Sequence, residues 1–174
     1  SIINNILINK LSKFLYKYRA LIAVPFFVVL VMRSRPAGSL LIPVILTLIG
    51  LVIRVWAAGY IGHAARGRDF RSQFRITSGP YKLLRHPLYI GNFFLVCGTI
   101  FLYNPKPWLA AVLIGIFLIE YGIIIAGEER FLKDLQKKEE KFALHRLRHE
   151  LSTWVVVAFV WAVYFLRFII NIAR

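Results

Sequence analysis

Residues 78–92 read SGPYKLLRHPLYIGN and hold the side chains best suited to chemistry. Arg85, His86 and Tyr89 place a permanent cation, a titratable imidazole and a phenol close together in the chain. Such a set can bind an anionic or polar ligand. The alternative is an interfacial belt, in which Arg binds lipid phosphate, Tyr lies at headgroup level and His ends a turn. Residue types alone leave both interpretations open.

A second group of ionisable residues lies further along the chain. Glu128 and Glu129 directly follow an apolar run, where the helix dipole disfavours anions. They either form surface pairs with Arg130 and Lys133 or bind ribose hydroxyls or a cation. Glu120 lies about two turns inside the same run and shares a helix face with Glu128. We expect it either to pair with Arg54, inside another apolar run, or to bind substrate.

The histidines and the single cysteine give little support for a metal site. His145 and His149 are one helical turn apart, but no third ligand is fixed near them. Cys97 is the only cysteine, which excludes a disulfide within the chain and a multi-cysteine metal site. We therefore predict no metal.

The elements that position these residues are apolar segments. Of the 174 residues, 59% are hydrophobic, and five runs approach the roughly 20 residues that a membrane-spanning helix needs. We predict an all-α, polytopic integral membrane helical bundle forming a single domain over residues 1–174, with about five transmembrane helices: 15–32, 39–62, 88–103, 107–127 and 151–173.

The net charge of +15 comes from basic residues between the apolar runs, so it indicates membrane topology rather than nucleic-acid binding. Seventeen Lys and Arg residues fall on the side of the N-terminus and five on the other side, with Arg54 inside a run. The positive-inside rule then predicts a cytoplasmic N-terminus and cytoplasmic long loops. The turn YNPKP predicts an antiparallel hairpin that brings Glu128 and Glu129 close to His86 and Tyr89.

Two motifs in this order carry a resemblance to a known family. GPYKLLRHPLYIG, residues 79–91, and EERFL, residues 128–132, resemble the paired signatures of the isoprenylcysteine carboxyl methyltransferase and phospholipid methyltransferase superfamily. The resemblance covers roughly residues 50–135. After Leu135 the chain departs from the family pattern, which usually continues into a segment with spaced aromatic residues. Part of the family's cofactor and acceptor pocket is therefore not matched.

The resemblance implies an integral membrane enzyme that uses S-adenosylmethionine in a pocket at the cytoplasmic helix ends. A lipophilic acceptor, a prenylcysteine carboxylate or a lipid headgroup, would arrive from the bilayer and receive the methyl group by in-line transfer. The cofactor contacts it implies are Tyr81, His86, Pro87, Tyr89, Glu128 and Glu129. The catalytic candidates are Arg85, for an anionic group, and Glu120, as a base for an ammonium acceptor.

Two other functions remain as alternatives. Membrane sterol reductases resemble this superfamily and carry a similar RHP motif, but they reduce a double bond with NADPH. The upstream GPY and the downstream EE favour methyl transfer. The other alternative is a non-catalytic membrane protein that binds anionic lipid through its basic loops. The partners expected in each case are membrane lipids and no nucleic acid, and the sequence does not determine the oligomeric state.

Overall fold

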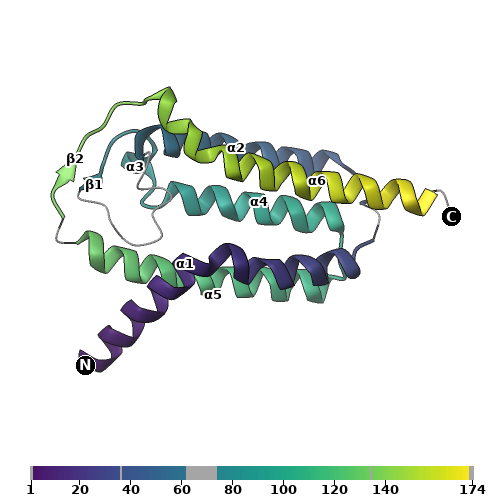
Figure 1. Ribbon diagram of the computed structural model, residues 1–174, viewed down its shortest axis with the longest axis horizontal. Coiled ribbons are helices and arrows are strands. Elements are labelled where there is room, and N and C mark those ends of the chain that lie inside the picture. The colour runs from purple at the N-terminus through teal and green to yellow at the C-terminus, as the bar shows by residue number, and fades with distance from the viewer. Residues whose placement is uncertain (1, 36, 62–73, 134, 173–174) are drawn as a thin grey trace.

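The computed structural model describes residues 2–35, 37–61, 74–133 and 135–172, which form a bundle of long helices (Figure 1). These helices are α1 (Ile2–Met32), α2 (Leu41–Ile61), α4 (Pro87–Tyr103), α5 (Pro107–Leu132) and α6 (Leu151–Ile172). Short elements gather near one end of the bundle, with β1, β2 and α3 at the left of Figure 1. They are β1 (Arg75–Ile76), α3 (Pro80–Leu83), β2 (Lys137–Lys138) and the 3-10 helix η2 (Leu144–Glu150).

Within the described residues, four helices are long and apolar enough to cross a membrane: residues 10–32 of α1, α2, α5, and α6 with the preceding η2. Helix α4 is apolar too, but it is shorter, at 17 residues. Apolar side chains point outward from the bundle, as lipid contact requires; Leu21, Val52 and Val155 are 65 to 68% exposed. The expected all-α, polytopic helical bundle is therefore confirmed.

Helix α5 is longer than the sequence suggested, and this corrects one expectation. It continues to Leu132, so Glu128 and Glu129 lie within its last turns instead of following its end. The sequence from Glu128 to Leu132 contains no Gly or Pro and consists mostly of good helix formers, which explains the extension.

The expected tight turn joins α4 to α5. Asn104 ends α4 in the left-handed conformation, with φ 43°, and its N–H bonds the carbonyl of Ile100 at 2.9 Å. Pro107 then starts α5, a position where the missing N–H of proline has no cost.

Glycines let α2 and α4 approach each other closely. A Cβ on Gly91 would lie 2.5 Å from Arg54 Cγ and 3.0 Å from the carbonyl oxygen of Gly50. A Cβ on Gly98 would lie 2.9 Å from Thr47 Oγ1. Small residues at such a contact are typical of membrane helices, which gain stability from close packing. Gly91, the last residue of the first motif, is therefore a helix-packing residue.

The two long loops are joined at one end of the bundle. Strands β1 and β2 pair in parallel, with Arg75 opposite Lys137 and Ile76 opposite Lys138. The Ser78 hydroxyl donates to the Glu140 carbonyl at 2.7 Å and accepts from the Glu140 N–H at 2.8 Å. The segment after Leu135, where the chain departs from the family pattern, is thus held against the loop that precedes the first motif.

Candidate functional site

His86 lies between the two glutamates of the second motif. Its Nε2 is 2.8 Å from Glu129 Oε1, and its Nδ1 is 3.3 Å from Glu128 Oε2. The side chains of all three residues are mostly buried. Burial alone would lower the pKa of His86, but its contacts with the two carboxylates outweigh burial and raise this pKa above the ordinary value. The expected meeting of the two motifs is therefore present in the structure.

Two arginines also stand near Glu129. Arg75 Nη2 lies 3.6 Å from Glu129 Oε1, and Arg85 Nη1 lies 4.0 Å from Glu129 Oε2. The Arg85 side chain is 76% exposed, so this longer contact costs it little hydration. Arg85 thus stands at the rim of the cluster and presents its charge outward.

Aromatic rings cover the inner side of the cluster. The rings of His86 and Tyr89 are stacked with centroids 5.6 Å apart, and the Tyr121 ring meets Tyr89 edge-on at 5.2 Å. Tyr16 of α1 packs with Tyr89 and Ile124 in one buried group. Arg19 lies over the Tyr16 ring, 4.4 Å from its centroid. Helix α1 therefore supplies a phenol and a cation beside the motif residues.

Two buried polar atoms, Tyr81 Oη and Glu120 Oε1, have no hydrogen-bond partner in the described part of the chain. Among the described residues, Glu128 Oε2 has only its 3.3 Å contact with His86 Nδ1. Burial in the first place, and the Glu128 charge in the second, raises the pKa of Tyr81 well above its ordinary value, so its hydroxyl keeps its proton. Buried polar groups left unpaired cost free energy. One donor, Tyr81 Oη, and one carboxylate oxygen, Glu120 Oε1, are consequently available to a polar ligand.

Arg54 has a different partner from the one the sequence suggested. Its Nε and Nη2 each donate to the Glu150 carboxylate at 2.9 Å, and Nη2 also donates to Thr153 Oγ1 at 3.1 Å. Nη1 donates to Asn92, whose amide donates to the Tyr121 hydroxyl at 2.9 Å. The pair of Arg54 with Glu120, one of the two alternatives for Glu120, is therefore wrong, because the guanidinium is engaged by groups from α4, η2 and α6.

The structure brings most of the expected residues together. His86, Tyr89, Glu128 and Glu129 meet, and Pro87 begins α4 directly behind them. Glu120 is eight residues before Glu128 on α5, about 12 Å along the helix axis. Arg75, Tyr16 and Arg19 were not expected in the site, since each was only one of many basic or aromatic residues flanking an apolar run.

Fold and site together define a polytopic membrane protein with a charged, aromatic-lined site where two motifs meet. The chain belongs to the phospholipid methyltransferase family, whose model matches residues 39–139. This match confirms the resemblance noted in the motifs. Helix α1, which contributes Tyr16 and Arg19, lies before the matched region.

Two curated relatives share part of the chain. It is 36% identical over 106 residues to the cobalt-zinc-cadmium resistance protein CzcN of Cupriavidus metallidurans. The matched segment covers 58% of this chain and 46% of that protein. It is also 37% identical over 79 residues to the nickel-cobalt-cadmium resistance protein NccN of Alcaligenes xylosoxydans xylosoxydans. That match covers 45% of this chain and 34% of that protein. The chain thus matches less than half the length of either relative.

No solved structure matches the chain. Within the described residues there is no group of three or more His, Cys, Asp and Glu side chains that could hold a metal ion.

Proposed function

We propose that this protein is a membrane methyltransferase that transfers a methyl group from S-adenosylmethionine to a lipid acceptor. The single observation that carries the proposal is the contact of His86 with Glu128 and Glu129, which joins the two family motifs in one buried cluster. Family membership favours methyl transfer over the reductase alternative, because the matched model is that of phospholipid methyltransferases.

The residues of the cluster fit this cofactor. Its ribose hydroxyls need a carboxylate, its ammonium needs an acceptor and its carboxylate tail needs a donor or a cation. Glu128, Glu129 and the unpaired Tyr81 Oη, together with the Arg85 charge, provide these groups. When bound, S-adenosylmethionine supplies an electrophilic methyl group on a sulfonium. The role of the chain is to orient the two reactants and exclude water.

We further propose that the acceptor atom is an amine of a lipid headgroup. Tyr16, Tyr89 and Tyr121 present aromatic rings, and Glu120 adds a buried carboxylate oxygen without a hydrogen bond in the described chain. Aromatic faces and carboxylates both favour a cation. An ammonium must lose a proton before it attacks, and Glu120 is the residue we assign to take it. A prenylcysteine carboxylate is already deprotonated, so it would not need Glu120 as a base.

Transfer of labelled methyl groups tests the proposal. The purified full chain in nanodiscs receives labelled S-adenosylmethionine and a lipid extract, with a prenylcysteine analogue in a parallel reaction. We expect alkali-stable label in the organic phase, as methylated amines give, whereas methyl esters would release methanol in alkali.

Glu129→Gln and Glu139→Gln form a matched pair for this assay. Glu139 is exposed and outside the cluster. Loss of a charge-assisted hydrogen bond costs about 1.5–3 kcal/mol, so Glu129→Gln should lower transfer by about 10- to 100-fold. Glu139→Gln should transfer as the wild type does. If neither lipid nor analogue is labelled and the cofactor does not bind, the proposed activity is wrong.

A further inference from the structure

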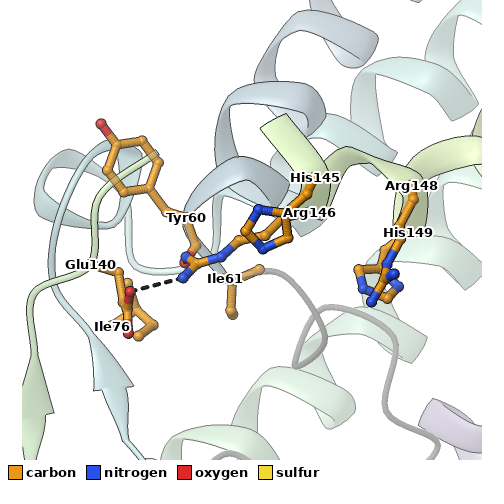
Figure 2. Close-up of a pocket in the computed structure, with 8 residues that line it drawn as sticks. All are labelled: Tyr60, Ile61, Ile76, Glu140, His145, Arg146, Arg148 and His149. Carbon is orange, nitrogen blue, oxygen red and sulfur yellow. Dashed lines mark hydrogen bonds and ion pairs between the residues drawn. The ribbon is translucent and has the colours of Figure 1, made fainter. Parts of the chain in front are cut away.

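A charged cavity outside the candidate site lies where α2 ends against η2. Its volume is about 310 Å³, and its polar lining comes from two segments far apart in the sequence (Figure 2). The lining residues are Tyr60, Ile61, Ile76, Glu140, His145, Arg146, Arg148 and His149. None of them belongs to the His86, Glu128 and Glu129 cluster.

The charge of this cavity is positive. Among the described lining residues Glu140 is the only carboxylate, and it is already held by Arg146 Nη2 at 2.9 Å and by Lys138 Nζ at 2.7 Å. The hydrogen bond from Lys138, and next that from Arg146, lower the pKa of Glu140 to about 2. The Glu140 carboxylate therefore stays ionised and bound to these two cations. Arg146 also donates to the Tyr60 carbonyl and is thereby fixed in the wall. Arg148 adds a second guanidinium to the lining, and His145 and His149 add imidazole rings.

The cavity continues into an apolar stripe that faces lipid. In a 3-10 helix, residues three apart lie on the same side, so His145, Arg148 and Leu151 form one row. Helix α6 extends this row at α-helical spacing with Val155 and Phe159. Leu151, Val155 and Phe159 are 54, 67 and 58% exposed. A ligand that follows the row needs an anionic head and an apolar tail.

We propose that this cavity binds a phosphate group, supplied by a membrane phospholipid whose chains lie along α6. Arg148 is the cation that meets the phosphate, and Arg146 forms the fixed wall behind it. Guanidinium groups bind phosphate oxygens in paired hydrogen bonds, and this site lies where a membrane-entering helix begins. The site requires no turnover and is separate from the proposed methyl transfer.

Lipid counting by native mass spectrometry tests this site. The full chain in detergent is titrated with phosphatidic acid in one arm and with inorganic phosphate in another. Arg148→Gln removes one basic side chain near the membrane surface, so it should weaken phosphatidic acid binding about fivefold. Arg148→Lys should retain most of the affinity. Arg33→Gln is the matched control, since Arg33 is exposed beyond the end of α1 and outside the cavity.

The two arms distinguish the source of the phosphate. Lipid binding that depends on Arg148, with no competition from inorganic phosphate, identifies a headgroup; equal binding of inorganic phosphate identifies a soluble anion. Arg148 is exposed, so these variants should fold. The inference is overturned if Arg148→Gln binds both probes as the wild type does. It is also overturned if that variant loses only S-adenosylmethionine binding, which would assign the cavity to the cofactor.

Discussion

At the scale of single residues, His86 carries the most information about the site. Its two ring nitrogens face two different carboxylates, which favours the doubly protonated imidazolium. The positive charge then sits between Glu128 and Glu129 and reduces the repulsion between these neighbours. The imidazolium thus makes it possible for two neighbouring carboxylates to be mostly buried together.

The raised pKa of His86 predicts a pH dependence of stability. A group whose pKa is higher in the folded state than its ordinary value of 6.5 stabilises the fold fully below pH 6.5. This stabilisation is lost as the pH rises through the folded-state pKa. Thermal unfolding of the wild type and His86→Gln in detergent between pH 5.5 and about 9 measures it. The difference in unfolding temperature between the wild type and His86→Gln should shrink as the pH rises. A difference that grows with pH would contradict the contact of His86 with the two glutamates.

At the scale of elements, close packing of α2 against α4 depends on glycine. Gly91→Ala places a methyl group 2.5 Å from Arg54 Cγ, and the Arg54 hydrogen bonds prevent that side chain from moving away freely. Overpacking of this kind costs about 1–3 kcal/mol. Each kcal/mol lowers the midpoint of thermal unfolding by about 2–4 °C in a chain of this size.

Gly115→Ala is the control for this substitution. Gly115 lies on α5, and a Cβ there would meet nothing within 4 Å. The unfolding temperature of Gly115→Ala should equal or exceed that of the wild type. If Gly91→Ala unfolds at the same temperature as Gly115→Ala, the close approach of α2 and α4 is not as described.

The helices and the meeting of the motifs could be predicted from the sequence, because apolar length and the Asn104–Pro107 turn are local signals. The partner of Arg54 could not be predicted, since Glu150 is 96 residues away and lies in a loop-like segment with several other charges. The contribution of Tyr16 and Arg19 was equally hidden, because basic and aromatic residues before an apolar run normally indicate topology. Long-range side-chain pairing leaves no periodic trace in a single sequence.

At the scale of the whole molecule, the distribution of charge predicts its orientation. The long loops carry most of the Lys and Arg residues, and the α4–α5 turn carries only Lys106. We expect the turn to lie outside the cytoplasm and the candidate site to lie on the cytoplasmic side.

Single cysteines can measure this orientation. In a Cys97→Ala background, Lys106→Cys and Lys82→Cys place exposed thiols at opposite ends of the bundle. A membrane-impermeant maleimide should label Lys106→Cys on intact cells and Lys82→Cys only after the membrane is opened. The reverse pattern would place the site on the outer side.

The buried pair of Arg54 and Glu150 also has a consequence for biosynthesis. Arg54 lies within α2, and an arginine at the centre of a spanning helix costs about 2.5–3.5 kcal/mol on insertion. Its partner is made 96 residues later, which is roughly 5–20 s at ordinary translation rates. Asn92 emerges earlier, 38 residues after Arg54. The nascent chain therefore holds the Arg54 guanidinium without its carboxylate partner until η2 is made, so the packing of α2 is completed late in synthesis.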